Sequence, residues 1–287
     1  MSRAGLAAVA FTAMALIGAD CAGAQTVGGR LKSIGESKTI RIAHRTDAVP
    51  FSYRSNEGPA GYTIDICKLI VASLERQLGV QNMKIEWVPV TTQTRFDVIV
   101  QGKADLECGS STVTLGRMKQ VDFSNYVFVE STGLAVRRDA GISGLKDVGG
   151  KKIAVIAGTS NEKAIALLNQ QRQLNAVVVP VKDRDEAVAA LDSKRVDAFA
   201  WDKLLLIAAQ YKDRQDILLL PDDLSIEPYA IALPRGDWEL RLAVNTALGE
   251  IFRTGGVKGI FGRWFGSISE QPTVLLSSVY LLGALAE

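Results

Sequence analysis

Three small hydroxyl side chains and an arginine lie close together in the segment ECGSSTVTLGR, which runs from Glu107 to Arg117. Ser110, Ser111 and Thr112 are consecutive, and the arginine follows five residues later. Hydroxyl groups and a guanidinium can bind an anion together, because both donate hydrogen bonds and the guanidinium adds a positive charge. A solvated loop has a similar composition, so this segment alone does not distinguish the two interpretations.

Further polar side chains follow other strand-like segments. Ligands of open α/β sheets bind beyond the carboxyl ends of the strands, so we expect these side chains to line one site. An amino acid requires a cation for its α-carboxylate and an anion for its ammonium group, and additional arginines favour a ligand with a second carboxylate. The candidate residues include four arginines but only one obvious carboxylate. The candidate ligand-binding residues are Arg45, Thr92, Arg95, Ser110, Thr112, Arg117, Thr159, Arg184 and Asp202.

Each of these residues also has a purely structural interpretation. A single arginine after a strand is commonly a surface residue. Thr92 and Thr159 could be the N-caps of helices, and Asp202 could cap the helix-like segment KLLLIAAQY. The functional interpretation therefore depends on whether the side chains converge in space.

Composition limits the classes of function. The chain has 287 residues, of which 47% are hydrophobic and 22% charged, which is typical of a globular protein large enough for two domains. The formal net charge of +2 gives no broad basic surface for nucleic acid. The single histidine, His44, excludes a histidine-rich metal site and limits nucleophilic catalysis. We expect no metal and no cofactor.

The N-terminus has the pattern of a secretory signal peptide over residues 1–24. Arg3 precedes an apolar run from Leu6 to Ala19, which is short for a membrane span, and small residues then indicate cleavage near Ala24. Cys21 follows an aspartate, which is a poor context for lipoprotein processing. The mature protein is therefore expected outside the cytoplasm.

The mature chain keeps two cysteines, Cys67 and Cys108. An exported protein permits a disulfide between them. Two buried free thiols are the alternative, and the sequence does not decide between them.

Strand-like and helix-like segments alternate along the mature chain. TIRIAH predicts a strand, and the apolar spacing in residues 63–79 predicts a helix capped by Thr63 and ended by Gly79. The pattern continues with a strand in KIEWVPV, a short helix capped by Thr92 and a buried strand in ADLEC. Residues 151–202 repeat the same alternation. Such alternation implies two lobes, each with a parallel sheet covered by helices.

Two β-rich segments are expected to cross between the lobes. They are Tyr126–Arg138 and Tyr229–Pro234, and the helical residues after the second should pack on the first lobe. The expected organisation is residues 25–129 in lobe 1, 130–228 in lobe 2, and 229–287 returning to lobe 1. The last apolar segment, Val274–Leu285, has the length of a packed helix and not of a membrane span. A chain that crosses twice forms a hinge.

Several motifs resemble those of the family 3 extracellular solute-binding proteins, especially the glutamate/aspartate-binding proteins of ABC importers. The resemblance covers Leu31–Gly266 and implies an α/β, two-lobed, type II periplasmic-binding-protein fold with two crossover strands as hinge. Residues after Ser267 match poorly, and we infer no role for them. The motifs are HRTDAVPFSY, GYTIDICKLIV, VPVTTQTRFDVIVQGKADLECGSSTVTLGRMKQVDFS, AGTSNE and WDKLLL.

The resemblance also implies roles for the candidate residues. Arg117 would bind the ligand's α-carboxylate, helped by Ser110, Thr112 and Thr159, and Asp202 would accept the ammonium group. Arg45 and Arg95, with Thr92, would bind a side-chain carboxylate. Arg184 stands where relatives often carry histidine, which leaves the preference between glutamate and aspartate open.

The implied function is capture of L-glutamate or L-aspartate by hinge closure, followed by docking on an inner-membrane ABC permease. We expect a periplasmic monomer that is not an enzyme. One alternative is a secreted dehydratase-like enzyme on the same fold. It would need a general acid, and Asp202 is the one carboxylate that the sequence clearly places in the cleft. The other alternative is a ligand-sensing module for a receptor.

Overall fold

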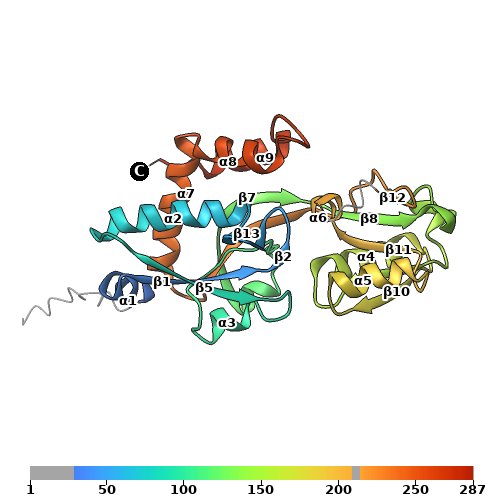
Figure 1. Cartoon of the computed structure of the whole chain (residues 1–287), viewed down its shortest axis with the longest axis horizontal. Coiled ribbons are helices and arrows are strands. Elements are labelled where there is room, and N and C mark those ends of the chain that lie inside the picture. Colours follow the sequence, from blue (N-terminus) through green and yellow to red (C-terminus); the bar gives the residue numbers. More distant parts are fainter. Residues whose placement is uncertain (1–28, 209–213, 287) are drawn as a thin grey trace, which may run out of the picture.

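The computed structural model describes residues 29–208 and 214–286, which form two lobes built on two five-stranded sheets (Figure 1). The predicted signal peptide, residues 1–24, lies outside the described residues. The lobes lie at opposite ends of the long axis of the molecule, with the C-terminal helices on the side of the first (Figure 1). The predicted two-lobed α/β architecture is therefore confirmed.

The first sheet is mixed and not wholly parallel. β1 runs parallel to β5 and β6, whereas β13 runs antiparallel to both β6 and β7. The prediction of a parallel sheet was wrong for this lobe. The strand β13, on which the chain returns from the second lobe, enters the sheet from the opposite end and is therefore antiparallel to its neighbours. The strands, in order, are β5 (Lys84–Val90), β1 (Thr39–Arg45), β6 (Leu106–Glu107), β13 (Glu227–Pro234) and β7 (Val121–Glu130).

The second sheet has a parallel half and an antiparallel half, so the prediction of a parallel sheet was wrong for this lobe as well. β9 pairs in parallel with β10 and β11, and β8 pairs antiparallel with β11 and β12. Its helices are α4 (Ser160–Arg172), α5 (Arg184–Asp192) and α6 (Lys203–Ala208). The strands, in order, are β10 (Val177–Val181), β9 (Lys152–Ile156), β11 (Ala198–Asp202), β8 (Thr132–Arg137) and β12 (Ile217–Leu219).

Helices of the first lobe pack on its sheet and on one another. The long helix α2 begins one residue before the predicted cap, Thr63, which is itself buried in the helix. Gly61 precedes it at φ 134°, where an added Cβ would lie 2.2 Å from the carbonyl oxygen of Phe51. The helices are α1 (Arg30–Ser37), α2 (Tyr62–Leu78), α3 (Asp97–Val100), α7 (Trp238–Arg253), α8 (Gly256–Phe265) and α9 (Val274–Gly283).

Short elements complete the chain. Three strands, β2 (Asp47–Ala48), β3 (Ser52–Ser55) and β4 (Gly58–Ala60), form a small antiparallel sheet after β1. Three 3₁₀ turns are η1 (Arg117–Lys119), η2 (Arg138–Ala140) and η3 (Leu145–Asp147).

The chain passes between the sheets at two places. Ser131 separates β7 of the first sheet from β8 of the second, within the predicted segment Tyr126–Arg138. The return was predicted in Tyr229–Pro234, but these residues pair only within the first lobe. The chain crosses back earlier, between Leu219 and Glu227, because β13 is wholly occupied in pairing with β6 and β7.

A cluster of buried aromatic rings fills the first lobe near the crossovers. Phe51 lies 4.9 Å from Phe128 and 5.2 Å from Tyr229, measured between ring centroids. The C-terminal helix α9 joins this core, since its Tyr280 hydroxyl lies 2.7 Å from that of Tyr62. This agrees with the predicted packed helix. Within the described ranges, none of the helices is long and apolar enough to cross a membrane.

Cys67 and Cys108 form a disulfide, with their Cα atoms 6.5 Å apart. The bond joins α2 to the residue directly after β6. Of the two alternatives left open by the sequence, the bridged one is therefore correct. The disulfide anchors the start of the hydroxyl-rich segment to the helical layer.

Candidate ligand-binding site

The hydroxyl-rich segment is held against β13 and is not a free loop. The carbonyl oxygen of Ser111 accepts a hydrogen bond from the Ala230 amide at 3.2 Å, and the Val113 amide donates to Pro228 at 2.8 Å. Thr112 lies between them and forms an isolated antiparallel bridge with Tyr229. These backbone bonds leave the side chains buried at the edge of the first lobe.

Arg95 and Arg117 bring two guanidinium groups together beside one aromatic ring. Their Cζ atoms lie 4.9 Å and 5.3 Å from the centroid of Phe96. Neither forms an ion pair with another described residue. Arg117 donates to the carbonyl oxygen of Thr112 at 2.7 Å, and Arg95 makes a long contact of 3.5 Å with that of Ser110. Burial and the neighbouring Arg117 lower the pKa of Arg95 to about 9.

A buried acid, Glu107, lies among these cations. Burial raises its pKa, while the nearby Arg95 acts in the opposite direction. Neither of its carboxylate oxygens has a hydrogen-bond partner among the described residues. Gly109 makes room for it, because a Cβ there would lie 2.2 Å from Glu107 Oε1. The sequence indicated Asp202 as the one acid clearly placed in the cleft. This expectation was wrong, because Glu107 is a second acid in the same region.

Asp202 ends β11 in the second lobe and is bonded by residues of both lobes. The amide nitrogen of Asn161, in α4, donates to its Oδ1 at 2.8 Å, and the hydroxyl of Tyr229, in β13, donates to its Oδ2. Burial raises the pKa of Asp202 to about 6. The residue does not act as a simple helix cap, since both of its oxygens are engaged by side chains of other elements.

The N-terminus of α4 faces the first lobe. Thr159 is its N-cap, with Oγ1 accepting from the Glu162 amide at 3.2 Å and donating to the Ile156 carbonyl at 2.6 Å. The capping interpretation is therefore correct for this side chain. The next residue, Ser160, donates to Thr112 Oγ1 at 3.1 Å. A helix N-terminus adds a partial positive charge to an anion site.

Arg45 is buried but already paired. Its Nη2 and Nε atoms lie 2.7 Å and 3.0 Å from Asp47 Oδ1. The neighbouring His44 is also buried, with Nδ1 2.9 Å from the carbonyl oxygen of Arg45, and burial lowers its pKa. The charge of Arg45 is thus largely balanced before any ligand binds.

Thr92 and Arg184 lie at a separate, more open place between the lobes. They line a cavity of about 210 Å³ together with Asp47, the partner of Arg45. Thr92 does not cap a helix, because α3 begins only at Asp97. Arg184 bonds Asp185 at 2.9 Å and starts α5. These two residues are therefore not brought into direct contact with Arg95 and Arg117.

Sequence reasoning missed three residues of the buried cluster, which are Glu107, Asn161 and Tyr229. The first two belong to motifs already singled out, ECGSST and GTSNE, but nothing in their spacing indicates which way they face. Tyr229 reaches Asp202 from a strand 27 residues further along the chain. Only the folded arrangement of the crossovers makes that contact.

The arrangement can bind a molecule with anionic and cationic groups. Arg95, Arg117 and the N-terminus of α4 present donors and positive charge, and Asp202 presents an acceptor opposite them. Burial strengthens such charge-assisted bonds, because little water competes. Within residues 29–208 and 214–286, no group of three side chains suited to a metal ion occurs.

Two lobes of this kind, joined by a pair of crossovers and lined with such groups where they meet, define a bilobal solute-binding protein. The sequence profile described as bacterial extracellular solute-binding proteins, family 3, matches residues 40–267. The chain belongs to this family.

Two relatives with reported binding roles cover most of the chain. The L-glutamate/L-aspartate-binding protein of Pseudomonas aeruginosa is 33% identical over 241 residues, which is 83% of this chain and 80% of that protein. The glutamate/aspartate import solute-binding protein of Escherichia coli K12 is 30% identical over 247 residues, or 84% of this chain and 81% of that protein.

Solved structures share the fold with other ligands. An ancestral arginine-binding protein bound to glutamine is 29% identical, with a TM-score of 0.68 over 80% of this chain and 98% of that one. The ancestral amino acid-binding protein AncCDT-1, described as a precursor of cyclohexadienyl dehydratase, is 28% identical, with a TM-score of 0.69 over 83% of this chain and all of that one. The fold thus occurs with several ligand chemistries.

Proposed function

We propose that this protein is the periplasmic binding component of an ABC importer for acidic amino acids, L-glutamate or L-aspartate. The observation that carries the proposal is the pair of neighbouring guanidiniums of Arg95, which is buried, and Arg117, which is half-buried, with no ion-pair partner among the described residues. Two like charges held close together are unfavourable. Glu107 beside them offsets them only in part, because burial raises its pKa, and a ligand with two carboxylates would balance both. The two glutamate/aspartate-binding relatives support the same assignment.

We assign the α-carboxylate to Arg117, Thr112 and the N-terminus of α4. The α-ammonium group would bond Asp202, whose orientation Asn161 and Tyr229 maintain. The side-chain carboxylate would bond Arg95. Ser110 would help to bind a carboxylate, and its hydroxyl is buried at this place.

The remaining candidates would act at the margin of the site. Arg45, already paired with Asp47, would orient this part of the first lobe rather than supply a free charge. Thr92 and Arg184 line the adjacent interlobe cavity, where they would influence the length of side chain that is accepted.

Transport would proceed by capture on closure. The ligand bonds residues of both lobes, so it stabilises the closed arrangement by differential contacts. The closed monomer would then dock on an inner-membrane permease and release the amino acid.

Isothermal titration calorimetry with glutamate, aspartate, glutamine and arginine tests the proposal. We expect glutamate or aspartate to bind at least about a hundredfold more tightly than glutamine or arginine, since a neutral or cationic side chain leaves Arg95 unbalanced. The variant Arg95→Gln should lose much of this preference for the acid. Tighter binding of arginine or glutamine would contradict the proposal.

A dehydratase-like activity is the second candidate. Two observations favour it, namely buried acids with raised pKa values, Glu107 and Asp202, and the similarity to AncCDT-1. A protonated carboxyl group in a closed site can act as a general acid. Incubation of the purified protein with prephenate, followed by chromatography of the products, tests this candidate, and an absence of turnover would exclude it for that substrate.

A further inference from the structure

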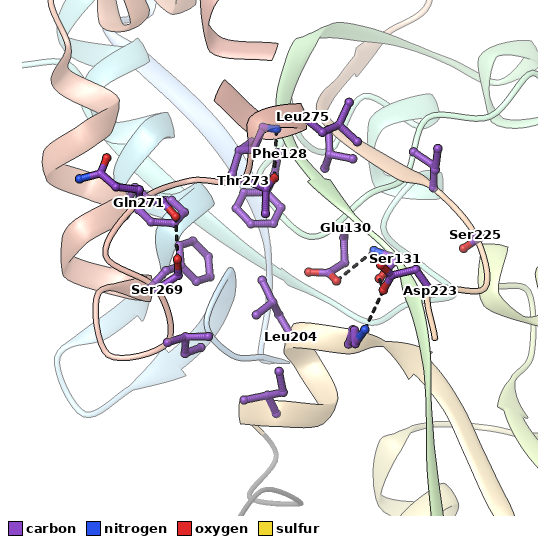
Figure 2. A pocket seen from close by; sticks show the side chains of 18 residues that line it. Phe128, Glu130, Ser131, Leu204, Asp223, Ser225, Ser269, Gln271, Thr273 and Leu275 are labelled. Carbon is purple, nitrogen blue, oxygen red and sulfur yellow. Dashed lines mark hydrogen bonds and ion pairs between the residues drawn. The ribbon is translucent and has the colours of Figure 1, made fainter. Parts of the chain in front are cut away.

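A second cavity lies at the hinge, beside the proposed amino-acid site but lined by other residues. It has a volume of about 370 Å³ and is enclosed by the end of β7, the helix α6 and the segment that joins α8 to α9 (Figure 2). None of the nine candidate ligand-binding residues lines it. Part of its wall, from Ile268 to Leu276, follows the region that matches the family, residues 40–267.

The wall of this hinge cavity is mostly apolar. At the mouth, Ile226 is 71% exposed, Leu275 50% and Ile268 43%. Exposed apolar side chains around a cavity are unfavourable in water and are typical of a ligand site. The apolar residues of the interior are Phe128, Leu204, Ile207, Phe261, Phe265 and Leu276.

One polar side chain of the wall has an unused acceptor. Glu130 is 93% buried, since only 7% of it is exposed, and its Oε1 accepts from the Ser131 amide at 2.9 Å. Its Oε2 has no hydrogen-bond partner among the described residues. In Figure 2 the carboxylate lies among the lining side chains, between Phe128 and Leu204.

The nearby cation is already bound elsewhere. Lys203 donates to Asp223 Oδ1 at 2.8 Å and to the Pro221 carbonyl at 2.6 Å, and Ser131 donates to the same aspartate at 2.7 Å. The wall therefore carries one uncompensated negative charge when Glu130 is ionised. Burial raises the pKa of Glu130 to about 8, and the negative charges of Asp202 and Asp223 act in the same direction, whereas the backbone amides of Ser131 and Leu204 act in the opposite direction.

We propose that the hinge cavity binds a small primary amine with an apolar body, whose ammonium group bonds the carboxylate of Glu130. The apolar walls would remove the body of the ligand from water. The ammonium would supply the donor and the positive charge that the buried carboxylate lacks. A neutral ligand would gain only the first of these contributions.

The first experiment separates the charge from the apolar body. Calorimetry on the wild-type protein at about pH 9, where Glu130 is ionised and the amine still carries its proton, compares 2-phenylethylamine with 2-phenylethanol, which has the same apolar body without the charge. We expect the amine to bind at least about tenfold more tightly, and Glu130→Gln to reduce the difference to less than about threefold. Absence of amine binding, or an unchanged preference in Glu130→Gln, would overturn the proposal.

The second experiment locates the bound amine. Leu275→Trp replaces a leucine at the mouth of the cavity by a bulkier aromatic side chain. The matched control is Leu281→Trp, on the same helix, because Leu281 is 77% exposed and does not line the cavity. We expect the first variant to weaken 2-phenylethylamine binding at least about tenfold and the second to change it less than about twofold. Equal affinities in the two variants would overturn the assignment. Neither experiment uses an amino acid, so the result is independent of the proposed transport function.

Discussion

Ser160 and Thr112 are joined by a hydrogen bond of 3.1 Å between their hydroxyl groups. Ser160 is the first residue of α4 in the second lobe, whereas Thr112 is held against β13 of the first lobe. The bond therefore connects the two lobes directly. A second connection nearby, from Tyr229 to Asp202, also joins them. The two lobes are thus in direct contact at this place.

Removal of this interlobe bond should weaken ligand binding modestly. A neutral hydrogen bond contributes about 0.5–1.5 kcal/mol, so Ser160→Ala should raise the Kd for the amino acid by about two- to twelvefold. Calorimetry measures the Kd. The double variant with Thr112→Ser retains a hydroxyl at residue 112 and should add little. An affinity equal to that of the wild type in Ser160→Ala would argue against a role of the bond in closure.

Arg117 should be much more important than Ser160. Truncation of one partner of a buried charge pair costs about 2–5 kcal/mol, so Arg117→Ala should raise the Kd for glutamate at least about thirtyfold. Arg117→Lys should recover little, because lysine lacks the planar fork that binds both carboxylate oxygens. Arg172→Ala, at an exposed position of α4, is the control and should bind normally. Retained affinity in Arg117→Ala would contradict the site assignment.

Ligand affinity should depend on pH through Asp202. Its ordinary pKa is 3.8, and burial raises it to about 6 in the protein. The ammonium group requires the ionised carboxylate, so the Kd should rise by up to about tenfold for each pH unit below about 6. Calorimetry between about pH 7 and about pH 5 measures this change. Asp202→Asn should bind weakly at every pH, and a constant wild-type Kd over this range would exclude the mechanism.

Stability should fall as pH rises through the range set by Glu130. The unfolded chain loses this proton near pH 4.5, whereas the folded protein keeps it up to about pH 8. Between these values each pH unit lowers the free energy of unfolding by about 1.4 kcal/mol at most. Glu130→Gln should therefore show a smaller loss of stability than the wild type between pH 4.5 and pH 8.

Urea denaturation at several pH values measures this difference. His44, whose pKa burial lowers, contributes a slope of opposite sign, but it does so equally in both proteins. Asp202 and Glu107, whose pKa values burial also raises, contribute slopes of the same sign as Glu130, but they are present in both proteins. The difference between wild type and variant therefore reports on Glu130. Parallel stability curves for the two proteins would show that this carboxyl group titrates normally.

The disulfide should stabilise both the fold and the site. Cys67 and Cys108 are 41 residues apart, and closing a loop of that length in the unfolded chain stabilises the folded state by about 4 kcal/mol in the chain-entropy estimate. The double variant Cys67→Ser, Cys108→Ser should lower the free energy of unfolding by about 2–4 kcal/mol in urea. An unchanged free energy of unfolding would show that the bond constrains the unfolded chain very little.

Much of the architecture is predictable from local patterns. The apolar spacing of α2, the Thr159 cap of α4 and the alternation of strands and helices all depend on residues within one or two turns of each other. Local patterns also identified the hydroxyl-rich segment as a candidate for ligand binding, because polar residues that follow a buried strand lie at its carboxyl end. One exception has a local cause, since Gly61 and not Thr63 is the N-cap of α2, whereas the antiparallel β13 depends on pairing with strands far away in the chain.

The sequence by itself therefore determined the two-lobed fold class and the set of side chains available for binding. The tertiary structure decided which charges remain free. Arg45 pairs with Asp47 and Arg184 with Asp185, whereas Arg95 and Arg117 face Glu107 without forming an ion pair with it. Electrostatic energy depends on distances and burial between segments far apart in the chain. Spacing along the sequence contains no such information, and only the folded lobes bring Tyr229 to Asp202.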